Sequence, residues 1–131
     1  MTTIRELMQS ELITVHPESP LRLALERLID HGISGLPVVD DDDKVVGVLS
    51  EKDLLKVFYE NHPETVADVM TRDAHAISVD APLVDVFDCL MAYDLRRVLI
   101  HEDGKLVGLI SRADLMPTIL EALLERSGGA R

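Results

Sequence analysis

The sequence is poor in aromatic residues, cysteine and positive charge. Two Phe, two Tyr and no Trp require an aliphatic core and leave few rings on which the bases of a single-stranded nucleic acid could stack. The single cysteine, Cys89, excludes an intrachain disulfide and fits a reducing compartment. With 13 Lys and Arg against 24 Asp and Glu, the net charge of −11 repels phosphate backbones, so we expect no nucleic-acid partner.

Long apolar runs are missing as well. No stretch approaches the roughly 18 apolar residues of a membrane helix, and the first residues lack the apolar segment of a signal peptide. We therefore expect a cytoplasmic protein with no membrane partner. A chain of 131 residues that is 47% hydrophobic can bury a sizeable core without disulfides or a structural metal.

An internal repeat organises the chain. The segment Lys44–Leu54 (KVVGVLSEKDL) returns 61 residues later as Lys105–Leu115 (KLVGLISRADL), with six identical positions out of eleven. We predict two similar halves, over 1–60 and 61–126, and a flexible tail over 127–131. Each half alone would bury little surface, so the two halves should pack sheet face to sheet face with clefts between them.

Each half shows the pattern of a β-α-β-β-α unit, which predicts an α/β (α+β) fold. Apolar residues recur at helical spacing after Pro20 and Pro82, and Gly32 suits the left-handed end of the first helix. We predict strands over 12–15, 36–40 and 45–49 and a closing helix over 51–59 in the first half. In the second half we predict strands over 76–79, 98–101 and 106–110 and a closing helix over 112–126.

A Gly-x-x-Ser-x-x-Asp motif ends the third strand of each half. Its two copies are Gly47, Ser50 and Asp53, and Gly108, Ser111 and Asp114. A Ser followed by Asp three residues later is typical of helix capping. The same residues could also hold a ligand, because the glycine permits close approach to the backbone, a helix start favours anions, and a carboxylate accepts ribose hydroxyls. Both interpretations stay open.

Two adjacent arginines stand out in so acidic a chain. Arg96 and Arg97 precede the second strand of the second half, where the first half has Ser34 and Gly35. They could pair with surface carboxylates, which stabilises little. Alternatively, they could clamp an anion, since guanidinium groups bind phosphate in bidentate fashion.

These motifs, in this order and twice over, resemble those of cystathionine-β-synthase (CBS) domains. The matching segments span about residues 4 to 120 and are Ile13–Val15, Gly35–Asp40, Val69–Thr71, Ile77–Val79 and both Gly-x-x-Ser-x-x-Asp copies. The resemblance implies a stand-alone tandem pair, a Bateman module, with two clefts related by pseudo-twofold symmetry. It also implies a regulatory module that requires no cofactor and senses AMP, ADP, ATP or S-adenosylmethionine.

The resemblance assigns roles to residues in both clefts. In the first cleft Asp53 would accept the ribose hydroxyls, Ser50 would face the phosphate, and Arg96 and Arg97 would bind it. The adenine would lie near Thr14, Ser34, Gly35 and Val48. The second cleft would use Ser78, Ser111 and Asp114, with Ser34 and Gly35 opposite. Because that arrangement supplies no cation, we expect the first cleft to bind better. Leu99 departs from the pattern, since the first half has Pro37 there.

Other candidate sites are weaker. Asp40–Asp43 could attract a divalent cation, but such a run is typical of a solvated hairpin turn. The five histidines show no ligand pair at i, i+4 spacing and no Cys partner, so we predict no metal site. With neither a Gly-x-Ser-x-Gly motif nor a Ser-His-Asp order, we predict no catalytic residue and no enzyme.

The last predicted helix has an apolar face broader than one small sheet requires. Its apolar residues are Leu115, Met116, Ile119, Leu120, Leu123 and Leu124. An exposed remainder would mark an interface, so we expect a homodimer. In the alternative reading, the protein is a ligand-free adaptor that binds another protein through such faces, and both Ser-x-x-Asp motifs are only helix caps.

Overall fold

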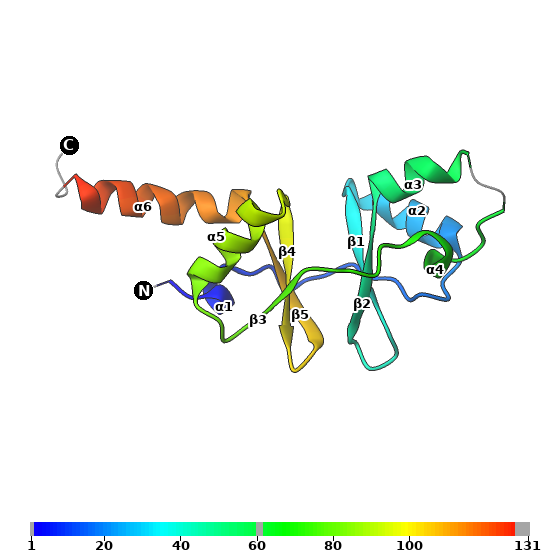
Figure 1. Cartoon of the computed structure of the whole chain (residues 1–131), viewed down its shortest axis with the longest axis horizontal. Helices are drawn as coiled ribbons and strands as arrows, with labels where there is room; N and C mark the ends of the chain where they lie inside the picture. Colours follow the sequence, from blue (N-terminus) through cyan, green and yellow to red (C-terminus); the bar gives the residue numbers. More distant parts are fainter. Residues whose placement is uncertain (1, 60–61, 128–131) are drawn as a thin grey trace.

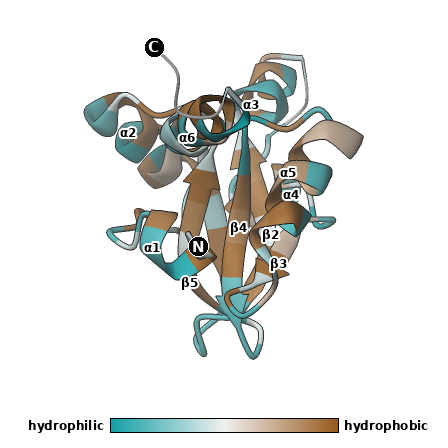
Figure 2. Cartoon of the chain, turned by 90° about the vertical axis from the view of Figure 1, so that its left-hand side faces the viewer, coloured by the Kyte–Doolittle hydropathy of each residue, from teal (hydrophilic) through white to brown (hydrophobic). Residues whose placement is uncertain are grey.

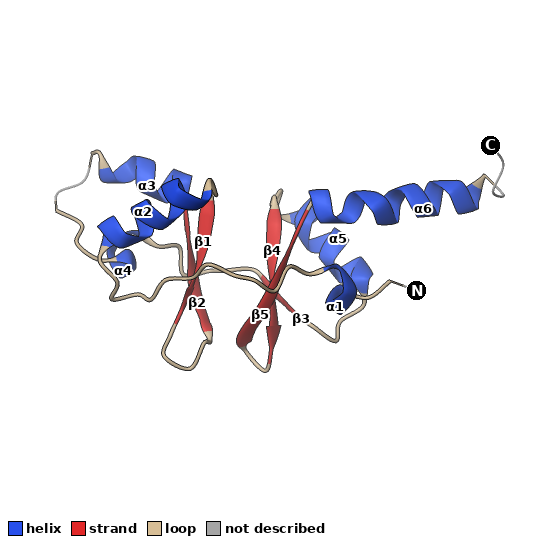
Figure 3. Ribbon diagram, turned by 180° about the vertical axis from the view of Figure 1, so that it is seen from behind, coloured by secondary structure: helices blue, strands red, loops and turns tan. Residues whose placement is uncertain are grey.

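A computed structural model describes residues 2–59 and 62–127 of the chain. Two small sheets lie side by side at the centre of an elongated molecule, and helices cover their outer sides (Figure 1; seen from behind in Figure 3). The predicted mixed α/β fold is therefore confirmed. The junction residues 60 and 61, and residues 128–131 of the predicted tail, lie outside the described residues.

The first half is built on an antiparallel pair of strands. Its elements are α2 (Leu21–His31), β1 (Gly35–Val39), β2 (Val45–Ser50) and α3 (Glu51–Val57). As predicted, α2 starts after Pro20 and ends at Gly32, which has a left-handed φ of 60°.

The predicted strand over 12–15 is wrong, because a single parallel bridge between Val15 and Val38 is all that forms there. Two features explain why the pairing does not extend beyond this single bridge. Pro17 has no N–H with which to continue a ladder, and the carbonyl of Thr14 accepts a hydrogen bond from Arg27 instead.

The second half has a complete three-stranded sheet. Its elements are β3 (Ala76–Ser78), α5 (Leu83–Ala92), β4 (Arg97–Glu102), β5 (Lys105–Ser111), a 3₁₀ turn η1 (Ala113–Leu115) and α6 (Met116–Arg126). The sheet order is β3-β4-β5, with β3 parallel and β5 antiparallel to β4. The helix predicted over 112–126 is interrupted near its start, where Pro117 occupies the first turn of α6 and the preceding turn tightens.

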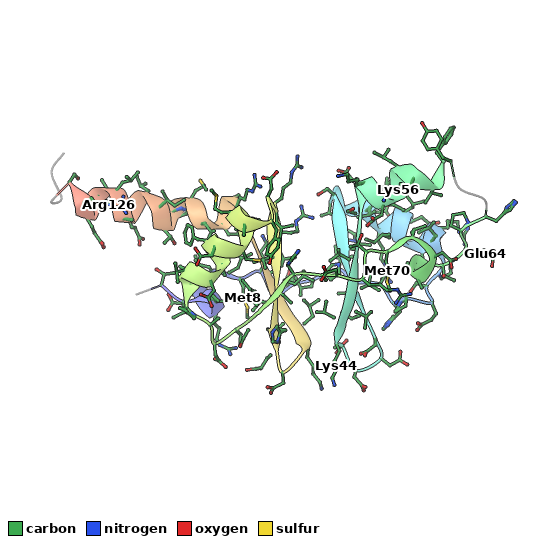
Figure 4. The ribbon with its side chains drawn as sticks, in the orientation of Figure 1. Met8, Lys44, Lys56, Glu64, Met70 and Arg126 are labelled. Atoms are coloured by element: carbon green, nitrogen blue, oxygen red, sulfur yellow. The ribbon has the colours of Figure 1, made fainter. Side chains whose placement is uncertain are left out.

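Each half also has a short leading helix, and the two halves exchange these helices. In α1 (Ile4–Leu7), Ile4 is fully buried in the core of the second half. In α4 (Val66–Val69), Val66 is fully buried in the core of the first half. Figure 4 shows the same exchange, with Met8 among the elements of the second half and Met70 among those of the first. The chain therefore crosses the middle of the molecule twice, once after α1 on its way to the first half and once after α4 on its way to the second half.

Both cores are aliphatic, as the composition requires. The fully buried side chains of largest volume are all Ile, Leu or Val. In Figure 2 the strands are largely hydrophobic and the hairpin turns below them hydrophilic. Cys89 packs against the second core, and partial burial raises the pKa of its thiol. Within residues 2–59 and 62–127, the helices are too short or too polar to cross a membrane.

Candidate ligand-binding cleft

A cavity of about 390 Å³ lies between the two halves, and we call it the central cavity. It collects residues from β1, β2, the segment leading to β3, and the start of β4. The polar residues in its wall are Ser34, Ser50, Thr71, Asp73, His75, Arg96 and Arg97, and the apolar ones include Leu36, Pro37, Val48, Leu49, Leu95, Leu99 and Leu109. A cavity with apolar walls and a few convergent polar groups is typical of a small-molecule site.

The two arginines enter this cavity from the second half. The Nη2 of Arg97 donates a hydrogen bond to Ser34 Oγ at 2.9 Å, so this side chain spans the two halves. Within the described ranges, neither Arg96 nor Arg97 forms an ion pair with a carboxylate. The alternative that they serve as surface ion pairs therefore finds no support. Two guanidinium groups without an ion-pair partner, which outnumber the one carboxylate of the wall, Asp73, favour an anionic ligand.

Asp53 lies behind the wall of the cavity and is only 7% exposed. Its Oδ2 accepts hydrogen bonds from the backbone N–H of Ser50 at 3.0 Å and from the Ser50 hydroxyl at 3.1 Å, and its Oδ1 accepts one from the Thr71 hydroxyl at 2.9 Å. In return, Ser50 Oγ accepts from the backbone N–H of Asp53, which completes a capping box at the start of α3. Asp53 thus positions two residues of the cavity, Ser50 and Thr71, without lining it.

The motif glycines contact the chain itself and not an open cleft. In one of the two interpretations left open above, Gly47 and Gly108 give a ligand room to approach the backbone, but the chain itself fills that room. A Cβ on Gly47 would lie 2.7 Å from the carbonyl oxygen of Thr71, and one on Gly108 would lie 2.6 Å from Met8 Sδ. Thr71 and Met8 each belong to the segment that follows an exchanged helix. The glycines therefore admit the crossing chain, because any side chain there would collide with it.

The second motif shows the same capping with a different neighbour. Oδ2 of Asp114 accepts from the backbone N–H of Ser111 at 2.8 Å and from the side-chain amide of Gln9 at 3.0 Å. Asp114 is half-exposed, whereas Asp53 is buried. Ser111 and Ser78 do not line the central cavity either, and Ser78 Oγ accepts the backbone N–H of Asp80.

Of the eight residues predicted for the first cleft, the structure brings six together. Ser34, Gly35, Val48, Ser50, Arg96 and Arg97 all line the central cavity, whereas Thr14 and Asp53 do not. Sequence reasoning missed Thr71, Asp73 and His75, which come from the segment before β3. The sequence contained a signal for Thr71, since Val69–Thr71 is one of the segments that resemble the family, but nothing in it showed that this segment packs against the first half.

Comparison with known proteins places this chain in a family. The CBS-domain model matches it twice, over residues 4–60 and 66–121, so the chain belongs to the CBS-domain family and contains a tandem pair. Among curated proteins, it is 30% identical over 112 residues to the inosine-5'-monophosphate dehydrogenase of Methanocaldococcus jannaschii and 28% identical over 120 residues to the A-adding tRNA nucleotidyltransferase of Aquifex aeolicus. These matches cover 85% and 92% of this chain, but the chain spans only 22% and 15% of the length of the two enzymes.

Solved structures of similar size also match. The structure of CBSX2 in complex with AMP has a TM-score of 0.82 and 30% identity, and the match covers 93% of this chain and 98% of that one. CBSX2 is a CBS-pair protein of Arabidopsis thaliana. The CBS pair of protein MJ0100, in complex with 5'-methylthioadenosine and S-adenosyl-L-methionine, has a TM-score of 0.79 and 26% identity, again covering 93% of this chain and 98% of that one.

Proposed function

We propose that the protein is a regulatory module that binds an adenosine-containing, anionic ligand in the central cavity. The observation that carries this proposal is the pair of arginines, which line a cavity and have no carboxylate partner among the residues described. The apolar wall formed by Pro37, Val48 and Leu99 offers a surface for a flat base. The AMP and S-adenosylmethionine complexes of similar CBS pairs support the ligand class.

In this proposal Asp53 remains the acceptor for the ribose. The hydroxyl of Thr71 donates a hydrogen bond to Oδ1 of Asp53 at 2.9 Å, and a ribose hydroxyl that replaced it would donate to the same carboxylate oxygen. Ser50 and Arg97 would then face the phosphate, and Ser34 would exchange its contact with Arg97 for one with the ligand. A ligand held from both halves favours the relative orientation of the halves that it fits best.

Calorimetric titration of the full chain with AMP, ATP, S-adenosylmethionine and adenosine tests the proposal. At least one of the first three should bind saturably and raise the melting temperature, and at equal concentration the tighter ligand should raise it more. Arg97→Ala should weaken AMP by about tenfold or more and leave adenosine nearly unchanged, because a charged hydrogen bond contributes roughly 1.5–3 kcal/mol. Arg22→Ala, which removes an exposed arginine that pairs with Glu26 on the same helix, is the matched control. Flat titrations with all four compounds at millimolar concentration would reject ligand binding.

Two further variants separate the roles of Asp53 and Thr71. Asp53→Asn should weaken all adenosine compounds, since the amide nitrogen cannot accept a ribose hydroxyl. Thr71→Val removes the competing hydroxyl and should leave adenosine binding unchanged or tighter. If Thr71→Val instead weakens adenosine as much as Asp53→Asn does, Thr71 is the ligand contact and Asp53 only positions it.

A ligand-free adaptor is the second candidate, and the exposed face of α6 favours it. None of the residues of α6 is buried, and Met116, Leu120 and Leu123 are more than half exposed.

We propose that a second copy covers this face, so that the protein is a homodimer of pairs in the cytoplasm. Light scattering should give twice the monomer mass, and Leu120→Glu should restore the monomer. A dimer together with flat titrations would favour the adaptor, which, like the sensor, needs no catalytic residue and no cofactor.

A further inference from the structure

Three potential metal ligands converge at one end of the first half, outside the central cavity. A ring nitrogen of His16, a carboxylate oxygen of Glu18 and a carboxylate oxygen of Asp41 all lie within 4.8 Å of one another. His16 and Glu18 belong to the segment before α2, and Asp41 belongs to the turn between β1 and β2. None of the three lines the central cavity. We call this group the His16 cluster.

One atom of the cluster lacks the partner that its burial demands. His16 Nδ1 has less than 1 Å² of exposed surface, although the side chain as a whole is 44% exposed, and it has no hydrogen bond within the described part of the chain. Oδ1 of Asp41 lies 4.0 Å from this nitrogen, which is too far for a hydrogen bond. Buried polar atoms normally have a partner, so this nitrogen points to a group that the protein atoms do not supply.

The backbone on both sides of the cluster is fixed, which holds the three ligands near one another. The bridge between Val15 and Val38 ties the segment of His16 to β1. Asp40 Oδ1 accepts the backbone N–H groups of Asp42 and Lys44, which secures the turn around Asp41. The Asp41 side chain itself is 94% exposed, so it can move toward an ion without disturbing the core.

We propose that the His16 cluster binds a divalent transition-metal ion, with Zn²⁺ as the best-fitting probe. One imidazole nitrogen and two carboxylate oxygens suit Zn²⁺, whereas Mg²⁺ and Ca²⁺ prefer oxygen ligands alone. Zn²⁺ binds its nitrogen and oxygen ligands at about 2.0–2.2 Å, so the three donor atoms would have to move closer to one another. The exposed carboxylates of Glu18 and Asp41 can make this movement by changing rotamer. Water completes the coordination. The surrounding carboxylates of Asp42 and Asp43 add negative potential that attracts the cation.

The second half serves as an internal reference, because it lacks the imidazole. At the positions that correspond to His16 and Asp41 in the repeat, it has Asp80 and Asp103. Its turn histidine, His101, is already engaged, since its Nδ1 accepts the backbone N–H of Gly104 at 3.1 Å. One Zn²⁺ per chain is therefore expected.

Titration of the tag-free full chain with Zn²⁺ at neutral pH tests the proposal. We expect one saturable site per chain, and we expect His16→Ala to weaken Zn²⁺ by more than the roughly 10–100-fold that loss of a supporting residue around a metal costs. His31→Ala removes an exposed histidine on α2 and should leave the affinity unchanged. Co²⁺ should give visible absorption bands that disappear in His16→Ala.

Paired turn variants separate ligation from general attraction. Asp41→Asn and Asp42→Asn remove the same charge from neighbouring positions, so ligation predicts a large loss of Zn²⁺ affinity for Asp41→Asn and at most a few-fold loss for Asp42→Asn. Equal losses, unchanged binding in His16→Ala, or the absence of a saturable site would each overturn the proposal. Because the cluster lies away from the central cavity, nucleotide binding should be the same in all these variants if they remain folded.

Discussion

The two halves share a local design and differ in the residues that face the cleft. In both, Ser and Asp cap the turn that follows the last strand, and a glycine admits the segment arriving from an exchanged helix. The first half, however, presents Ser34 and Gly35 where the second half presents Arg96 and Arg97. The repeated positions thus build the scaffold, and the positions that differ determine the chemistry of the cavity.

The crossing segments also differ. Thr71 follows α4 and donates its hydroxyl to a buried Asp53, whereas Gln9 follows α1 and donates its amide to a half-exposed Asp114. The first half consequently holds its crossing segment more tightly. Four predictions probe this difference, in order of decreasing effect.

Ile4→Ala should destabilise the second half of the molecule, although Ile4 lies in the first half of the sequence. Its fully buried side chain packs in the second core, so truncation should cost about 2–5 kcal/mol of unfolding free energy. Hydrogen exchange should accelerate in β4 and β5 more than in β1 and β2. Val66→Ala is the reciprocal variant and should loosen β1 and β2 instead. Loss of protection in β1 and β2 after Ile4→Ala would contradict the exchange of helices.

An alanine at each motif glycine should separate the two crossings. At Gly47 the new Cβ meets the backbone oxygen of Thr71 at 2.7 Å, which cannot move cheaply, so we expect a loss near the upper end of the roughly 1–3 kcal/mol range for overpacking. At Gly108 the nearest atom is the flexible Met8 side chain, so the loss should be near the lower end. Urea unfolding of both variants measures the difference, and equal losses would show that the crossings are equally rigid.

Asp53→Asn should destabilise the protein more than Asp114→Asn. Asp53 is buried and accepts three hydrogen bonds, and an amide can leave the Thr71 hydroxyl or the Ser50 N–H without an acceptor, at a cost of about 1–3 kcal/mol. Asp114 is half-exposed, so water can replace the hydrogen bonds that Asp114→Asn removes. We therefore expect a smaller loss of unfolding free energy. Thermal unfolding without ligand gives both values, and the reverse order would refute the tighter hold on the first crossing.

Acid should weaken the attachment of α4 before it affects α1. Asp68 accepts the backbone N–H groups of Thr65 and Glu64, and these hydrogen bonds lower the pKa of its carboxyl. A lowered pKa in the folded state means that this contribution to stability is complete above the pKa of the unfolded chain. It is lost as the pH falls through the folded value. Asp68→Asn should therefore be slightly less stable than the parent at neutral pH and equally stable once the pH lies below the lowered pKa of the folded state. A difference that persists in acid would point to another cause.

The sequence predicted the repeat, the family, the order of most strands and helices, and six of eight residues around one cavity. These followed from local patterns, since hydrophobic period and turn residues act over a few positions. The exchanged helices were not predicted, because four-residue helices have too few positions to show a period. Because the exchange was not predicted, a ligand was considered beside Gly47 where Thr71 lies. For the same reason Thr71 was overlooked as a residue of the cavity, and Asp53 was placed in the cavity wall. The His16 cluster was missed for a related reason, as His16 and Asp41 lie 25 residues apart in sequence and only the fold brings them together.

The exchange of leading helices has a consequence for the order in which the protein can be made. Residues 13–70 contain every member of the first core, so this half can close as soon as that stretch has left the ribosome. The second core requires Ile4 from the start of the chain and Leu115 from near its end. The side chain of Ile4 therefore cannot be buried in its core until the strands and the turn up to Leu115 have been synthesised. The time taken to translate residues 71–115 thus sets how long the apolar side chain of Ile4 stays uncovered.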